Sequence, residues 1–195
     1  MTESRTVQRG VPLTLPNILT FIRIAAIPLV VVLFYAPFSW AGEAAGLLFA
    51  AAGITDSLDG YLARRLGQTS RLGAFLDPVA DKLIVATALV LIVSHDPRVF
   101  IVLTAAVIIG REIAISALRE WMAELGQRRK VAVSVVGKYK TTLQIIGLSM
   151  MLFRSRLLDL PIYELGILLT VIAAVLTLAS MFAYLKAAWP ELRGG

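Results

Sequence analysis

The chain has 195 residues, of which 58% are hydrophobic and only 16% are charged, whereas soluble domains are about half apolar and about a quarter charged. This composition excludes an ordinary soluble domain and predicts a single domain in a lipid bilayer. The chain contains no cysteine, which excludes disulfides and thiol chemistry. The net charge of +6 fits basic loops that contact membrane lipids, and no nucleic-acid partner is expected.

Six apolar runs approach the roughly 20 residues that a membrane span requires. The expected fold is therefore an all-α integral membrane protein with six transmembrane helices, in one domain over residues 17–195. Residues 1–16 are polar and are expected to form a cytoplasmic arm or an interfacial helix. The expected spans cover residues 17–37, 43–62, 78–95, 99–120, 139–154 and 160–186.

The distribution of basic residues predicts the orientation of these spans. Loops on the cytoplasmic side of bacterial membrane proteins are enriched in Lys and Arg. With an even number of spans, one side would carry only Arg98, Arg154 and Arg156. Both termini are therefore expected in the cytoplasm, on the side that carries Arg5, Arg9, Arg64, Arg65, Arg71, Arg128, Arg129, Lys130, Lys138, Lys140, Lys186 and Arg193.

Four aspartates lie around the connection between the second and third runs. Asp56 and Asp59 are three residues apart, and Asp77 and Asp81 are four apart. Both spacings place side chains on one helix face. The first pair is expected at the end of one span and the second at the start of the next, with residues 63–76 as the connecting loop. The four carboxylates are therefore predicted to converge near the cytoplasmic surface.

Two interpretations of this convergence stay open. An Asp in mid-membrane costs roughly 2.5–3.5 kcal/mol, and four acids also repel one another, so cations must compensate them. Ion pairs with Arg64, Arg65 and Lys82 would be a structural solution. The favoured interpretation is a divalent metal site, because carboxylate oxygens suit Mg²⁺, Mn²⁺ or Ca²⁺. Four of them could hold the two ions of a phosphoryl-transfer site.

The wider pattern resembles a known family. The segment "D56-S-L-D59-G60-Y-L-A63-R64", then eight residues, then "G73-A-F-L-D77-P-V-A-D81" is similar to the signature of the CDP-alcohol phosphatidyltransferases. This resemblance implies a six-span, all-helical membrane enzyme, usually homodimeric, that displaces CMP from a CDP-alcohol. It also implies a location in the bacterial inner membrane, with the active-site cavity on the cytoplasmic side.

Individual roles follow from the same resemblance. The four aspartates would bind two divalent cations, Mg²⁺ or Mn²⁺, and Asp81 would also act as the catalytic base. The donor lipid, CDP-diacylglycerol, would contact the small or basic signature residues. These are Gly60, Ala63, Arg64 and Gly73. Asn17 and Arg23 are expected near the donor or the metals.

Basic residues in two further segments predict an anionic acceptor. Lys138, Lys140 and Thr141 open the fifth run, where a helix N-terminus and ammonium groups suit phosphate. Arg111 lies deep in the fourth run, and Arg119 lies about two turns nearer the cytoplasm. Membrane anchoring is the alternative for Arg119 and the lysines. For Arg111 the alternative is an ion pair, for instance with Glu112.

These segments extend the resemblance to nearly the whole chain. "L15-P16-N17", "R111-E112" and "G137-K138-Y139-K140-T141" are similar to the family members whose acceptor is sn-glycerol 3-phosphate. The implied reaction gives phosphatidylglycerol phosphate and CMP. An inositol phosphate, phosphatidylglycerol or serine as acceptor, a membrane prenyltransferase and a divalent-cation transporter are the alternatives.

Overall fold

The computed structural model describes residues 15–66, 71–127, 135–154 and 160–193. Side chains are described throughout these ranges except at 15–16, 56–66, 71, 74, 135–139, 187 and 190–193. The described part of the chain forms six helices. They are α1 (Leu15–Tyr35), α2 (Ala41–Leu66), α3 (Arg71–His95), α4 (Val99–Glu124), α5 (Val135–Phe153) and α6 (Ile162–Arg193).

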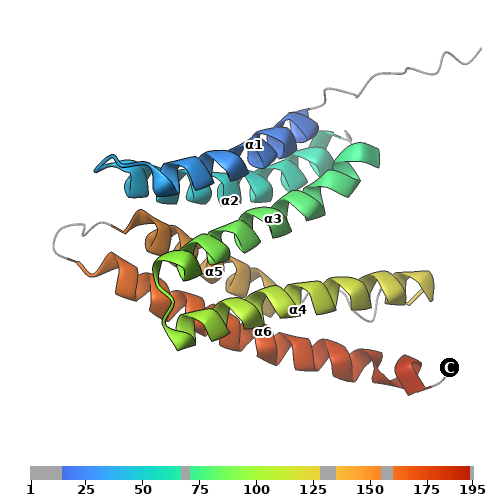
Figure 1. Ribbon diagram of the computed structural model, residues 1–195. Helices are drawn as coiled ribbons and strands as arrows, with labels where there is room; N and C mark the ends of the chain where they lie inside the picture. Colours follow the sequence, from blue (N-terminus) through green and yellow to red (C-terminus); the bar gives the residue numbers. More distant parts are fainter. Residues whose placement is uncertain (1–14, 67–70, 128–134, 155–159, 194–195) are drawn as a thin grey trace, which may run out of the picture.

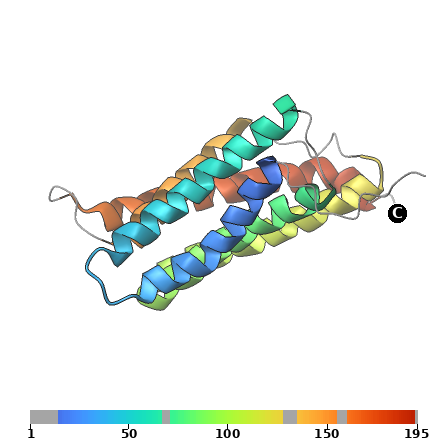
Figure 2. The ribbon, with the colours of Figure 1, turned by 90° about the horizontal axis from the view of Figure 1, so that it is seen from above.

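The helices form a bundle in which α5 lies between two groups (Figure 1). Helices α1, α2 and α3 pack on one side, and α4 and α6 pack on the other. Seen from above, α2 lies against α5 while α1 lies against α3 (Figure 2). The start of α1 and the end of α6 lie at the same end of the molecule, on the right in Figure 1.

Small residues allow α5 to approach its neighbours closely. A Cβ added at Gly147 would lie 2.9 Å from the carbonyl oxygen of Gly166 on α6, and one at Gly46 of α2 would lie 2.7 Å from that of Ser149. Such close backbone approach is how helices gain van der Waals contact in lipid, where no hydrophobic effect drives them together. Bulky side chains such as Leu148 and Leu152 fill the remaining space and are fully buried.

Within the described residues, three helical stretches are long and apolar enough to cross a membrane: Asn17–Tyr35, Val99–Glu124 and Ile162–Lys186. Shorter apolar stretches lie at Ala41–Thr55 and Lys140–Phe153. Large apolar side chains such as Val32, Leu103 and Val175 are exposed on the outer surface, as expected of helices that face lipid tails. The all-α membrane architecture is confirmed, and the number of six spans stays a prediction.

Two of the predicted helix bounds were wrong in a way that matters. Helix α2 continues to Leu66 and helix α3 begins at Arg71 and not at residue 78, so residues 63–66 and 71–76 of the predicted loop are helical. Gly73 therefore lies in a helix. Asp77 and Asp81 lie in its second and third turns, beyond the first turn in which the helix dipole favours negative charge. Hydropathy identifies segments that contact lipid, so it does not detect the polar first turns of α3, which are helical but not apolar.

The N-terminal start of α5 also differs from its expected position. This helix begins at Val135, four residues before the expected span at 139–154. Lys138 therefore lies in its first turn, whereas Lys140 and Thr141 lie in the second turn and not at the helix start. Phosphate binding by free N–H groups belongs to the first turn, so any contribution of Lys140 to anion binding would come from its own charge.

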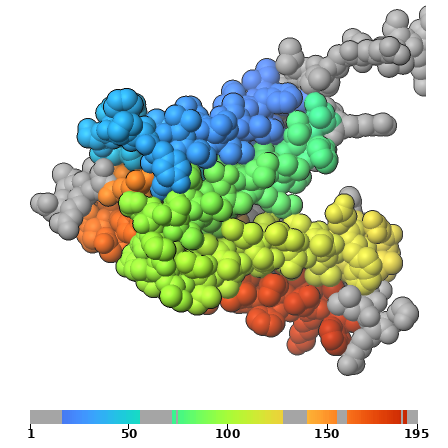
Figure 3. Space-filling model, in the orientation of Figure 1, coloured from blue at the N-terminus to red at the C-terminus, as the bar shows by residue number. Residues whose placement is uncertain are grey.

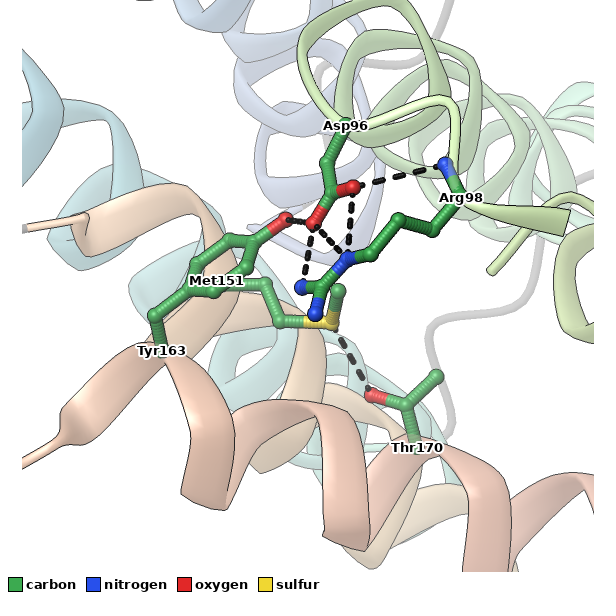
Figure 4. Close-up of polar contacts among 5 residues, drawn as sticks. All are labelled: Asp96, Arg98, Met151, Tyr163 and Thr170. Atoms are coloured by element: carbon green, nitrogen blue, oxygen red, sulfur yellow. Dashed lines mark hydrogen bonds and ion pairs between the residues drawn. The ribbon is translucent and has the colours of Figure 1, made fainter. Parts of the chain in front are cut away.

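A polar cluster joins the turn between α3 and α4 to the start of α6 (Figure 4). It lies at the end of the bundle opposite to the start of α1. Arg98 donates from Nε to Asp96 Oδ1 at 2.8 Å, and the hydroxyl of Tyr163, at the start of α6, donates to Asp96 Oδ2 at 2.9 Å. The hydrogen bonds from Arg98 lower the pKa of Asp96 to about 2. This cluster ties the α3–α4 turn to α6.

Candidate active site

A cavity of about 370 Å³ lies among α2, α3, α4 and α5, with Arg23 of α1 on its wall. Its apolar part includes Phe49, Ala52, Ile108 and Ile145. In Figure 3 the surface is hollowed between α3 and α4 toward the right-hand end. The described charged residues on the wall are four cations and two carboxylates, so the cavity has net positive charge. They are Arg23, Lys82, Arg111, Lys140, Asp81 and Glu112.

Arg23 connects α1 to the paired aspartates of α3. Its side chain is completely buried, and Nη1 donates to Asp77 Oδ1 at 3.1 Å and to Asp81 Oδ1. The two carboxylates meet the same nitrogen because their spacing places them one above the other on the helix face. Both remain more than one-third exposed, so further oxygen atoms are accessible to a ligand.

The predicted metal ligands are only partly described. Asp56 and Asp59 lie in α2, but their side chains are outside the described residues, and within those residues no cluster of three or more acidic, His or Cys side chains occurs. The described carboxylates converge on a positive group and offer hard oxygen donors, which is the donor chemistry that Mg²⁺ and Mn²⁺ require. Asp77 and Asp81 therefore fit a divalent cation.

Arg111 is held on the cavity wall from two sides. Its side chain is 8% exposed; Nη1 donates to Glu112 Oε2 at 2.7 Å, and Nη2 donates to Ser180 Oγ of α6 at 3.3 Å. The buried Nε has no hydrogen-bond partner among the described residues. The predicted ion pair with Glu112 is thus present, yet it leaves donor capacity for a ligand.

Lys140 is the other buried cation on this wall. The residue is 8% exposed, and no hydrogen bond or ion pair joins it to another residue in the described ranges. A buried ammonium without a counter-charge is unfavourable, so this position favours an anionic ligand. Thr141 and Gln144 line the cavity beside it.

Other predicted residues lie elsewhere. Arg119 is not on the cavity wall; its guanidinium lies 5.6 Å from the ring centre of Tyr184, in a cation–π contact. Asn17 is buried near the start of α1 and is not on the wall either. Gly73 lies in the first turn of α3. The side chains of four further predicted residues lie outside the described ones: Gly60, Ala63 and Arg64 on α2, and Lys138 on α5.

The structure therefore brings together five residues of the predicted set: Arg23, Asp81, Arg111, Lys140 and Thr141. It adds residues to which the sequence assigned no ligand role: Lys82, Glu112 and Gln144 on the wall, and Ser180 behind Arg111. Lys82 and Glu112 could have been found as neighbours of Asp81 and Arg111 in the chain. No pattern in the sequence singles out Gln144 or Ser180.

Residues 13–185 match the family model described as CDP-alcohol phosphatidyltransferase. The chain belongs to the CDP-alcohol phosphatidyltransferase family. It is therefore a transferase enzyme of a phospholipid-synthesising family. The signature of this family falls on the last part of α2 and the first part of α3, so the resemblance seen in the sequence is confirmed.

Relatives with curated names cover almost the whole chain. A protein of Salmonella choleraesuis (strain SC-B67) named CDP-diacylglycerol--glycerol-3-phosphate 3-phosphatidyltransferase is 52% identical over 178 residues, which is 91% of this chain and 96% of the relative. A protein of the same name from Escherichia coli (strain K12) is 51% identical over the same shares. This CDP-alcohol phosphatidyltransferase thus has close, full-length relatives with one named activity.

Proposed function

We propose that this enzyme transfers the phosphatidyl group of CDP-diacylglycerol to sn-glycerol 3-phosphate, giving phosphatidylglycerol phosphate and CMP. The observation that carries the proposal is the cavity wall, where Arg111 lies with Lys140, a buried residue that has no partner within the described residues. This arrangement suits a phosphate dianion better than a zwitterion such as serine, which needs less positive charge. The names of the relatives support the same acceptor.

The acceptor phosphate would bind to the basic wall of the cavity. Arg111 contributes a planar guanidinium suited to phosphate oxygens, and Lys140 contributes a point charge. Thr141 adds a hydroxyl on the same wall. Lys138, two residues before Lys140, is proposed as a further ligand of this phosphate. Arg119, two turns after Arg111, lies off the wall and is proposed to add positive charge near the cavity.

The donor and the metals would occupy the side of the cavity at α2 and α3. The four aspartates Asp56, Asp59, Asp77 and Asp81 would hold two Mg²⁺ or Mn²⁺ ions. When bound, such ions neutralise the pyrophosphate and stabilise the departing CMP oxygen. The donor would contact the small and basic residues of the signature, Gly60, Ala63, Arg64 and Gly73, with Asn17 nearby.

Asp81 is the proposed base. Its carboxylate would accept the proton of the free primary hydroxyl of glycerol 3-phosphate as that oxygen attacks the phosphorus that carries diacylglycerol. The bond from this phosphorus to the CMP oxygen breaks, and CMP leaves. Arg23, which donates to Asp81, would keep the carboxylate oriented toward the cavity that it lines.

We place the cavity and both termini on the cytoplasmic face of the bacterial inner membrane, with six spans. The start of α1 and the end of α6 share one end of the bundle, the surface between α3 and α4 is hollowed toward that end (Figure 3), and the basic loops favour that end as cytoplasmic. A homodimer is proposed from the family alone.

The test is CMP release by the purified enzyme with CDP-diacylglycerol and Mg²⁺ or Mn²⁺. Glycerol 3-phosphate, serine, an inositol phosphate and phosphatidylglycerol would be supplied in parallel. Release that requires glycerol 3-phosphate and stops with EDTA supports the proposal. Release only with another acceptor would overturn the assignment of the basic wall, and metal flux into proteoliposomes without CMP release would favour the transporter.

A further inference from the structure

We propose that Ser180 of α6, together with Glu112, is a positioning residue that aims Arg111 at the acceptor phosphate. This inference rests on the proposed function, since it takes Arg111 to be a phosphate ligand. Ser180 does not line the cavity, so any influence on the acceptor must pass through the arginine that it contacts.

The hydroxyl of Ser180 is committed to a fixed orientation. It is 9% exposed and donates its single hydrogen to the carbonyl oxygen of Thr177 at 2.8 Å. Because a serine hydroxyl has one hydrogen and two lone pairs, the oxygen is left as an acceptor. Arg111 Nη2 donates to that oxygen at 3.3 Å, in a buried hydrogen bond.

Glu112 fixes the guanidinium from another side. Its Oε2 accepts from Arg111 Nη1 at 2.7 Å, and its side chain is 43% exposed. Two contacts through different nitrogens define the plane of the guanidinium as well as its position. Bidentate recognition of phosphate depends on this plane, and each terminal nitrogen of Arg111 carries a second N–H that is not used by its contact with Glu112 or Ser180.

The two contacts contribute differently to binding. Glu112 lies on the cavity wall and carries a charge that opposes the acceptor's phosphate, so its removal changes both charge and geometry. Ser180 is neutral and lies behind the wall, so its removal changes geometry alone. Ser180 is therefore the residue whose substitution isolates positioning.

The first experiment measures the KM for glycerol 3-phosphate and for CDP-diacylglycerol in Ser180→Ala. We expect about a tenfold rise in the acceptor KM, since a buried hydrogen bond to a charged group is lost. The KM for CDP-diacylglycerol should stay unchanged. Ser180→Thr, which keeps the hydroxyl, should restore the acceptor KM.

Thr177→Val is the matched control. Thr177 lies one turn away on the same helix, and its buried hydroxyl has no partner among the described residues. The variant should leave both KM values unchanged. Equal rises of both KM values in Ser180→Ala, or an equal acceptor effect in Thr177→Val, would overturn the positioning role in favour of general packing. Ser180→Cys provides a second variant if Ser180→Ala is unstable in detergent.

A double-mutant cycle separates this inference from the proposed function. In an Arg111→Ala background, Ser180→Ala should cause no further rise in the acceptor KM, because the guanidinium that Ser180 positions is absent. An additive effect would overturn the inference. If Arg111→Ala leaves the acceptor KM unchanged, the proposed acceptor site itself is wrong. If Arg111→Ala raises that KM and Ser180→Ala does not, the positioning role of Ser180 is wrong and the proposed acceptor site is still supported.

Discussion

Lys140 combines burial with the lack of a counter-charge in the described structure, which makes its replacement informative. Lys140→Ala should raise the KM for glycerol 3-phosphate by roughly tenfold or more, because a buried charge-assisted contact to phosphate is lost. Steady-state kinetics with each substrate varied in turn would check this. Lys186→Ala, an exposed lysine on α6 that does not line the cavity, is the control. Similar rises in both substrate KM values would contradict an acceptor-specific role.

Asp81 is expected to affect turnover more than binding. Asp81→Asn keeps the size of the side chain but cannot accept the hydroxyl proton. The turnover number should fall about 10²–10⁴-fold, the range typical of a placed acid or base. CDP-diacylglycerol binding, measured by titration in the presence of Mg²⁺, should persist. Retained turnover would show that another group removes the proton.

Residue spacing predicts only what lies close together in the chain. The pairing of Asp77 with Asp81 follows from helical periodicity, and the structure confirms that both reach one partner. That partner, Arg23, is 54 residues from Asp77, and Ser180 is 69 residues from Arg111. Such pairs form only when whole helices pack against each other. A single sequence therefore indicates candidate functional residues but not which distant residues contact them.

At the scale of the helices, hydropathy predicts the segments within lipid better than the helices themselves. The expected runs at 17–37 and 99–120 correspond to α1 and α4 within a few residues. Polar helical ends are missed, as at Arg71 of α3. There the chain remains helical where hydrophobicity has already fallen, and these ends carry several of the predicted functional residues. The sequence therefore placed Asp77, Lys140 and Thr141 closer to helix starts than the structure does, and the site roles of these residues stay predictions.

Close packing between α2 and α5 gives a prediction about stability. An added Cβ at Gly46 would lie 2.7 Å from a backbone carbonyl of α5, so Gly46→Ala should destabilise the protein by about 1–3 kcal/mol through overpacking. Gly110→Ala is the control, because an added Cβ there meets nothing within 4 Å. It should be neutral or stabilise by about 0.5–1 kcal/mol, the helix preference of Ala over Gly. Thermal denaturation in detergent would compare them, and equal midpoints would contradict the packing argument.

At the scale of the whole molecule, the end opposite the cavity is expected to control stability without affecting chemistry. Asp96→Asn should lower the thermal midpoint at pH 7 by a few degrees and leave both KM values unchanged, because Arg98 and Tyr163 lose an ionised partner. The pKa of Asp96 is lowered to about 2. The stabilisation is therefore complete above the ordinary pKa of Asp, near 4, and is lost as pH falls toward 2.

The measurement is the difference in midpoint between wild type and Asp96→Asn across pH. This difference should be constant from pH 7 to about pH 5 and should shrink as the carboxylate of the wild type is protonated below about pH 4. Arg98→Gln provides a second variant with the same expected pH dependence. A difference that persists unchanged at pH 2–3 would show that the ionised carboxylate is not the source of stability.

The hollow between α3 and α4 has a consequence for how the enzyme meets its substrates. Leu83 and Ile113 line the cavity and are exposed, and the surface is hollowed between α3 and α4 (Figure 3); a cavity that opened sideways there would face the acyl chains of a surrounding bilayer. A lipid donor and a lipid product would then exchange within the plane of the membrane, while only the small polar substrate and CMP cross into water. The reaction rate would accordingly depend on the mole fraction of CDP-diacylglycerol in the membrane and not on its bulk concentration. Diluting the donor with inert lipid would then slow the reaction even when the total amount of CDP-diacylglycerol is unchanged.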